Sequence, residues 1–284
     1  MNRNTVLLAL PAFLILILFV AVIGSFASVS FMVLDPGTAV FHGPPTMANY
    51  AKLLASEGAW RAVLNTLRLS ALVSLLCVLL GYPLALLLAR SSSRGMRRTI
   101  LFCLVATFLS GGVTRAYAWL IILGNKGLIN QAAQAVGLPR MALINNDFAV
   151  VVSVLNFILP FFILTLFGAL RTIPVPLEHA ARNLGASRAR CFLNVTLPLS
   201  MPGLTAATSL CFALSLGAFL FPQMLGGGRV QVLATAIYER IQASYDIPAA
   251  AALAMLFFVL VMLMLAIVGA LRHLTSRRFA EDAA

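Results

Sequence analysis

Long apolar runs separated by short polar segments dominate this chain. Each of six runs has enough apolar residues to cross a bilayer as a helix of about 20 residues. They cover residues 6–33, 62–89, 100–123, 148–170, 200–224 and 249–271. The pattern predicts an all-α polytopic membrane protein with six transmembrane helices, forming a single transmembrane domain over residues 1–284.

The first run has an alternative interpretation as a signal peptide, because small residues near its end resemble a cleavage site. The apolar core of a signal peptide is about 7–15 residues long, and the run at 6–33 is much longer. We therefore expect an uncleaved first span.

The composition excludes two broad classes of protein. Hydrophobic residues make up 61% of the chain and charged residues 10%, against roughly 45–50% and about 25% in soluble domains. A soluble enzyme cannot hide that apolar excess, and a disordered chain would not have it. Six spans also leave no room for a separate catalytic domain. Four scattered cysteines without CxxC spacing and three distant histidines indicate packing residues, so we expect no catalytic residues and no metal site.

The positive charge is distributed unevenly between alternate loops. With the N-terminus inside, twelve arginines fall on the inner segments, and six lysines and arginines fall on the outer ones. The positive-inside rule then places both termini in the cytoplasm. The net charge of +12 is therefore interpreted as membrane topology, and no nucleic-acid partner is expected.

The polar segment at 171–199 lies between the fourth and fifth spans, on the predicted cytoplasmic side. It begins with two prolines, has an acid at the front of a short helix and arginines at its back, and so suits a helix dipole. Its small residues would let a groove on another protein approach the backbone: Ala180, Ala181, Gly185 and Ala186. Pro198 marks the start of the next span. The plainer alternative is an ordinary amphipathic loop.

These residues carry a family resemblance. Glu178-His179-Ala180-Ala181, Gly185 and Val195-x-Leu197-Pro198 resemble the cytoplasmic loop of permease subunits of bacterial ABC importers. That loop has the pattern Glu-Ala-Ala, three residues, Gly, nine residues, Ile, one residue, Leu-Pro. One position departs from the pattern, because His179 stands where the family has its Glu and Glu178 lies one residue earlier.

Further motifs resemble the spermidine/putrescine-type branch of these permeases. They are Asn49-Tyr50, Asn65-Thr66-Leu67, Gly81-Tyr82-Pro83, Arg115-Ala-Tyr117-Ala-Trp119, Gly127-Leu-Ile-Asn130 and Leu225-Gly226-Gly227-Gly228. The resemblance implies a multi-pass protein of the bacterial inner membrane that assembles with an ATPase dimer, a second related permease subunit and an extracytoplasmic solute-binding protein. It also implies that the 178–190 helix docks on the ATPase.

The chain has no ATP-binding loop of its own. Such a loop needs a lysine that directly follows a glycine, and the two lysines, Lys52 and Lys126, follow Ala51 and Asn125. We therefore expect a transport subunit rather than an enzyme, with no cofactor of its own and with ATP bound and hydrolysed by a partner.

Polar residues inside the predicted spans are candidates for the substrate path. Arg115 is the sharpest, because a charge near the bilayer centre costs at least about 2.5 kcal/mol. Its alternatives are snorkelling to the headgroups or pairing with a carbonyl at a helix end. Tyr117, Trp119 and Gln223 are further candidates. For Tyr117 and Trp119 interfacial anchoring is an equal alternative. Asn156 is interpreted as a hydrogen-bonding group between helices.

The substrate stays open at this point. The resemblance suggests a polyamine, yet no Asp or Glu lies within the six predicted spans, whereas a path for a polycation would be expected to offer carboxylates or aromatic cages. Two other functions remain in view, an ion-coupled secondary carrier and a non-transporting membrane scaffold. A carrier usually has buried ionisable groups at the midplane and broken helices in both halves.

Overall fold

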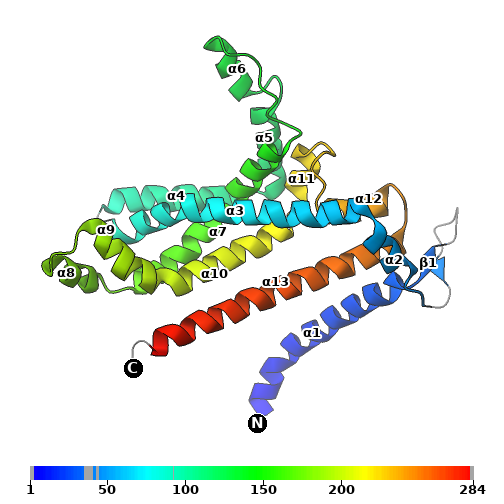
Figure 1. The fold of residues 1–284 in the computed structure, drawn as a ribbon, viewed down its shortest axis with the longest axis horizontal. Helices are drawn as coiled ribbons and strands as arrows, with labels where there is room; N and C mark the ends of the chain where they lie inside the picture. The colour runs from blue at the N-terminus through cyan, green and yellow to red at the C-terminus, as the bar shows by residue number, and fades with distance from the viewer. Residues whose placement is uncertain (1–2, 35–40, 43–44, 92, 282–284) are drawn as a thin grey trace. The chain divides into compact units, whose positions relative to one another are not determined.

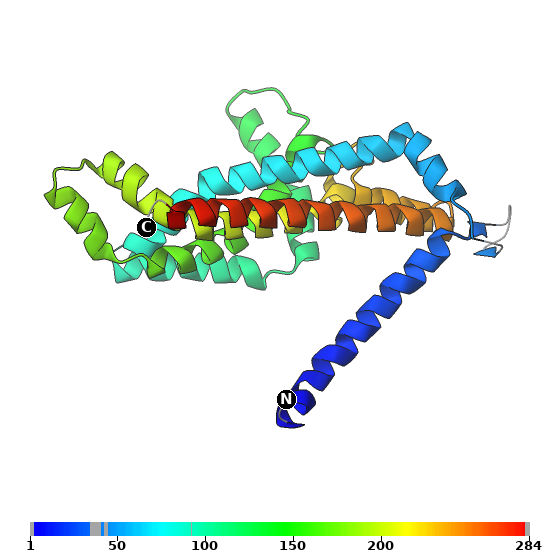
Figure 2. The ribbon, with the colours of Figure 1, turned by 60° about the horizontal axis from the view of Figure 1, so that its bottom comes forward.

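The computed structural model describes residues 3–34, 41–42, 45–91 and 93–281. The chain divides into two compact units, and each is described by itself. Unit 1 comprises residues 1–63 and 232–260, and unit 2 comprises residues 64–231 and 261–284. Figures 1 and 2 show the ribbon in two orientations.

Unit 1 gathers the N-terminal helices and a later helical segment. Its elements are α1 (Arg3–Ser30), β1 (Val33–Leu34), β2 (Phe41–His42), α2 (Ala48–Ala55), the start of α3 (Glu57–Arg90), α12 (Leu233–Gln242) and the first half of α13 (Ile247–Glu281). The two short strands pair antiparallel, with Val33 opposite His42. Asn49 anchors α2 to the end of α1, because its amide donates to the carbonyls of Ser30 and Met32 at 2.9 and 2.8 Å.

Unit 2 contains the larger core. Besides the rest of α3 its elements are α4 (Arg94–Leu109), α5 (Gly112–Leu123), α6 (Leu128–Ala135), α7 (Asp147–Thr172), α8 (Val175–Asn183), α9 (Arg188–Cys191), the π-helix η1 (Phe192–Thr196), α10 (Leu197–Leu216) and α11 (Leu220–Leu225). Buried side chains of α3 and α7 dominate that core, and α5, α10 and α11 each add a few. Gly203 of α10 lies against Ala169 of α7, where a side chain at position 203 would collide, so these two helices approach closely.

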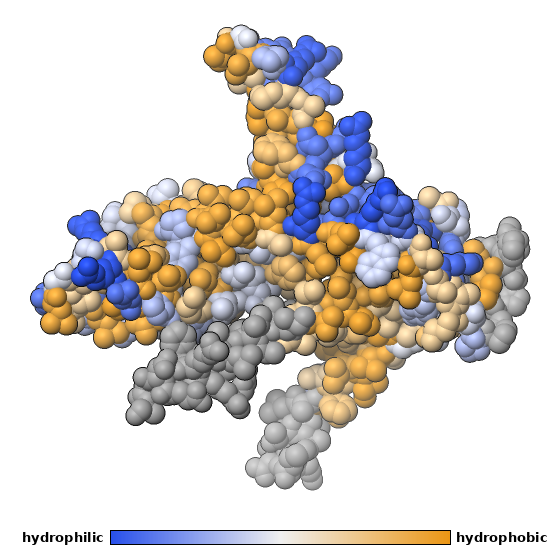
Figure 3. All heavy atoms as spheres, viewed as in Figure 1, coloured by the Kyte–Doolittle hydropathy of each residue, from blue (hydrophilic) through white to orange (hydrophobic). Residues whose placement is uncertain are grey.

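The predicted all-α polytopic architecture is confirmed. In the described chain five helices are long and apolar enough to span a membrane, and there are six if the bent pair that begins with α4 and α5 counts as one span. The space-filling view shows hydrophobic residues over the long helices of unit 2 and hydrophilic residues at its α8–α9 end (Figure 3). The orientation of the termini stays a prediction.

The run at 100–123 is interrupted where Ser110, Gly111 and Gly112 predict a break, and the stretch 112–135 is bent by 101° from α4. Two details of the predicted layout are wrong. The run at 200–224 is interrupted at Gly217, where α10 ends before α11. The loop expected at 124–147 contains α6, whose eight residues were too few and too polar to stand out.

Candidate functional site

The segment at 171–199 forms a separate lobe at one end of unit 2 (Figures 1 and 2). After α7 the chain turns through Ile173 and Pro174, and α8 begins at Val175 with Pro176 in its first turn. Proline suits this position because the first amides of a helix have no internal partner. A short α9 and the π-helix η1 then lead without a break into α10.

Gly185 ends α8 in a left-handed conformation, with φ of +85°. The amide of Ala186 donates to the carbonyl of Ala181 at 3.0 Å, and the amide of Gly185 donates to that of Arg182 at 2.9 Å. This pair of bonds is a Schellman motif, in which glycine is favoured because it has no Cβ penalty at positive φ. A side chain at Gly185 would meet nothing within 4 Å, so the chain itself leaves that space open.

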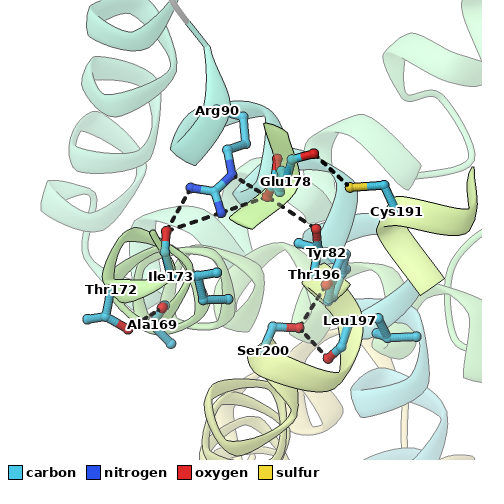
Figure 4. Close-up of polar contacts among 10 residues, drawn as sticks. All are labelled: Tyr82, Arg90, Ala169, Thr172, Ile173, Glu178, Cys191, Thr196, Leu197 and Ser200. Atoms are coloured by element: carbon cyan, nitrogen blue, oxygen red, sulfur yellow. Dashed lines mark hydrogen bonds and ion pairs between the residues drawn. The ribbon is translucent and has the colours of Figure 1, made fainter. Parts of the chain in front are cut away.

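Glu178 points into the lobe rather than outward. It lies in the first turn of α8 and is only 8% exposed. Nε of Arg90 donates to its Oε1 at 2.9 Å, and Nη2 of Arg90 lies 2.8 Å from the same oxygen (Figure 4). Each charge occupies a favourable helix end, the acid at the start of α8 and the arginine at the end of α3. The carboxylate that sequence analysis placed in the docking motif is therefore engaged inside this chain.

The same ion pair holds two further elements. The guanidinium of Arg90 donates to the carbonyl of Ile173 at 3.4 Å, and Ile173 is the C-terminal cap of α7. The hydroxyl of Thr196, in η1, donates to Oε1 of Glu178 at 3.1 Å. The thiol of Cys191 donates to the Glu178 carbonyl at 3.7 Å. Glu178 thus joins α3, α8 and η1, with the end of α7 held through Arg90.

A second contact ties α3 to the start of α10. The hydroxyls of Tyr82 and Ser200 lie 2.8 Å apart, and both residues are buried. Ser200 also donates to the carbonyl of Leu197 at 2.9 Å. The Tyr82 ring meets Phe192 of η1 edge to face, with centroids 5.6 Å apart.

The other predicted docking residues lie on the outside of the lobe. His179, Ala180 and Gly185 are exposed, and Ala181, Ala186, Leu197 and Pro198 are half-buried. Leu184, next to Gly185, is 89% exposed. An almost bare leucine surrounded by small residues is a surface on which another protein could pack. The acid and the rest of the motif are therefore divided, with Glu178 inside and the remainder accessible.

Three of the predicted substrate-path residues lie on α5, and the fourth, Gln223, lies on α11, which packs against α5. Arg115 is 7% exposed and donates to the Ser110 carbonyl at 3.1 Å and to the Ser110 hydroxyl at 3.0 and 3.3 Å. Its guanidinium also lies 5.3 Å from the centroid of the Phe157 ring. Ser110 is the C-terminal cap of α4, so Arg115 makes the helix-end pairing that was its alternative interpretation.

Two other path candidates are exposed, and one makes a contact between helices. Tyr117 is 57% exposed, and Gln223 is exposed on α11. Trp119 donates from Nε1 to Oδ1 of Asn156 at 3.4 Å, which agrees with the interpretation of Asn156 as a bridge between helices. A role for Arg115, Tyr117, Trp119 or Gln223 in a path stays a prediction.

Sequence reasoning missed the partners of Glu178. Arg90 entered only the topology argument, and Thr196 and Ser200 not at all. The signal for Arg90 was a single arginine directly at the end of an apolar run, a position shared by many membrane helices. Nothing in the local pattern names Glu178 as its partner.

Comparison with known proteins gives one family over nearly the whole chain. The model of the binding-protein-dependent transport system inner membrane component matches residues 1–277. The spermidine/putrescine transport system permease protein PotB of Haemophilus influenzae is 30% identical over 88% of this chain and 87% of its own length. The molybdenum transport system permease protein ModB of Mycobacterium tuberculosis is 36% identical over 77% of this chain and 81% of its own.

Solved structures share the fold. A chain of a bacterial alginate ABC transporter, in complex with an alginate-bound periplasmic protein, superposes with a TM-score of 0.78 at 20% identity and covers 98% of this chain and 96% of that chain. A chain of the MetNI methionine ABC transporter in an inward-facing conformation gives a TM-score of 0.59 at 21% identity, covering 77% of this chain and 98% of that one.

Proposed function

This chain belongs to the family of binding-protein-dependent transport system inner membrane components, and we propose that it forms part of the path for a small organic solute of the polyamine class. As a member of that family it is a multi-pass inner-membrane permease subunit of an ABC importer. In our proposal the solute arrives from an extracytoplasmic binding protein. A separate ATPase dimer docks on the 178–198 segment, and a second permease subunit completes the path.

The outer surface of α8 is the observation that carries the docking proposal. Leu184 is 89% exposed. Gly185 ends α8 in a Schellman motif, and no atom of the chain occupies the space that a side chain there would fill. The acid of the motif, Glu178, is paired with Arg90 inside the lobe. An apolar knob with a fixed backbone and small neighbours loses little conformational entropy when it enters a groove. That surface is therefore well suited to a partner protein.

The substrate proposal is supported by the relatives named above. The Haemophilus protein, PotB, is named for spermidine and putrescine transport. ModB, which is comparably similar to this chain, is named for molybdenum transport. Because relatives named for different solutes both resemble this chain, the identity of its solute needs a direct test. Uptake of labelled spermidine, putrescine, an amino acid and molybdate into right-side-out vesicles, with the binding protein outside and ATP inside, separates the classes. We expect binding-protein-dependent and ATP-dependent uptake of the polyamines, and uptake of molybdate alone would overturn the substrate proposal.

Docking can be tested at Gly185 with a matched control in the same chain. Gly137 ends α6 in the same way, with φ of +81°, a Schellman bond pair and no atom within 4 Å of a built Cβ. Asparagine tolerates this conformation, so Gly185→Asn and Gly137→Asn should both fold. We expect Gly185→Asn to lose the co-purified ATPase subunit and Gly137→Asn to keep it.

One result with these two variants would contradict docking at Gly185. If Gly185→Asn retains the ATPase as fully as Gly137→Asn does, the bare surface is not the docking site. Membrane abundance of both variants, measured by immunoblot, confirms that each chain accumulates. A transport assay that continues unchanged in vesicles lacking any ATPase would instead favour an ion-coupled carrier.

A further inference from the structure

We propose that the Arg90–Glu178 pair is the positioning contact that transmits movement of the 171–199 lobe to α3. The inference rests on the proposed docking of an ATPase on that lobe and adds the residues through which the movement continues. Glu178 lies on the inner side of α8, and its partner is the last residue of α3 (Figure 4). The side chain therefore joins a docking surface to a membrane helix.

The helix α3 is suited to carry a displacement away from the lobe. It is one continuous helix of 34 residues with Pro83 inside it, about 50 Å long at roughly 1.5 Å per residue. Because the helix has no break between Pro83 and Arg90, a displacement of its end at Arg90 is carried at least through its last two turns. By contrast, α4 and α5 are separated by a bend, so a displacement of α4 is transmitted less directly to α5.

The lobe is also connected covalently, through Ile173 to α7 and through η1 to α10. From α9 the chain passes through the π-helix η1 into α10. A π-helical turn is wider and less regular than an α-helix and often marks a functional site. The Thr196 hydroxyl within η1 donates to Glu178 at 3.1 Å, so this turn is held in its present form by the same carboxylate that holds Arg90. One carboxylate thereby contacts both the end of α3, through Arg90, and the covalent link to α10, through Thr196.

Burial makes this coupling sensitive to charge. The side chains of Arg90 and Glu178 are 18% and 11% exposed, so water and salt screen their attraction weakly. A displaced Glu178 must either carry Arg90 with it or leave a poorly solvated charge behind. The second outcome is unfavourable, and the movement is expected to reach α3. The Tyr82–Ser200 contact, without charge, lies about two turns further along α3 and ties it to α10.

Hydrogen exchange measured by mass spectrometry tests this proposal without knowledge of the solute. The intact importer, purified through this chain, is compared with and without ATP and vanadate. In the unmodified protein we expect exchange to change both in α8 and in the C-terminal half of α3. In Glu178→Gln, which keeps the size and an acceptor oxygen, the α8 change should remain and the α3 change should fall about tenfold, within the range of typical coupling free energies.

Matched variants separate transmission from general damage. Arg90→Lys keeps the positive charge and should keep most of the α3 response. The control is Glu57→Gln, which removes the carboxylate of the exposed Glu57–Arg61 pair at the other end of the same helix and should leave both responses unchanged. A merely structural role for Glu178 would instead lower membrane abundance and leave the ratio of the α3 to the α8 response unaltered.

Each result has a distinct meaning. A full α3 response in Glu178→Gln overturns the inference while leaving ATPase docking intact. Loss of the co-purified ATPase in Glu178→Gln, with normal abundance, also overturns it, because Glu178 would then belong to the docking surface. If the unmodified protein binds no ATPase, the proposed function itself fails. Should Glu178→Gln not accumulate, the unmodified protein still decides, since an α8 response without an α3 response contradicts the inference.

Discussion

Half-buried Arg90 and buried Arg115, both in unit 2, each bind the end of a neighbouring helix but differ in their other partners. Arg90 donates to the carbonyl of Ile173, the cap of α7, and Arg115 donates to the carbonyl of Ser110, the cap of α4. Each places a cation at the negative end of a neighbouring helix. Arg90 additionally binds the carboxylate of Glu178, whereas Arg115 has a hydroxyl and the ring of Phe157.

The difference in partners gives the two arginines different roles. Arg115 is a brace, which stabilises the bend between α4 and α5, and Arg90 is a link, which connects the lobe at 171–199 to α3. The partners of Arg115 lie within 42 residues of it along the chain and are neutral, and they connect the two sides of the bend between α4 and α5. Glu178 instead belongs to a segment whose outer face is open, and its pairing connects that face to α3. A buried charge pair is also more vulnerable to the loss of one member than a charge held by neutral groups.

The largest effect is expected from truncation of one member of the charged pair. Arg90→Ala leaves the Glu178 carboxylate buried without its cation and should lower the free energy of unfolding by about 3–5 kcal/mol. Denaturant unfolding in detergent measures this loss. Adding Glu178→Ala to Arg90→Ala should cost less than the sum of the two single changes. Additive losses would show that the two side chains act independently.

A smaller effect is expected at Arg115. Arg115→Ala removes hydrogen bonds from a charged donor but leaves only neutral groups, so the loss should be about 1.5–3 kcal/mol. The same unfolding measurement, combined with uptake per molecule of protein in the membrane, separates the two interpretations. Reduced stability with normal specific uptake supports the brace. Abolished uptake with unchanged stability would move Arg115 into the substrate path.

The sequence predicted what depends on local pattern. Hydropathy located the apolar runs, and the small residues around Gly185 marked the open side of α8. The polar and glycine residues at Ser110 and Gly111 indicated an interruption, but not a bend of 101°. That angle depends on how α5 packs against α7 and α11, which are distant in sequence.

The charged pair illustrates what could not be predicted. Arg90 and Glu178 are separated by 88 residues, and either one suits the end of its own helix without the other. The motif placed an acid near position 179 and so directed attention outward. Only the fold, which brings the end of α3 to the start of α8, turns Glu178 inward.

The smallest effect is expected at an exposed pair that serves as the reference for both arginines. Arg61 and Glu57 form an ion pair four residues apart on α3, with side chains 70% and 81% exposed. Such a pair contributes about 0.3–0.5 kcal/mol, because solvent screens it and ordering two long side chains costs entropy. Arg61→Ala should therefore leave the unfolding midpoint nearly unchanged and lose its small effect in high salt. If Arg61→Ala proved as damaging as Arg90→Ala, burial would not be the property that makes the loss of Arg90 costly.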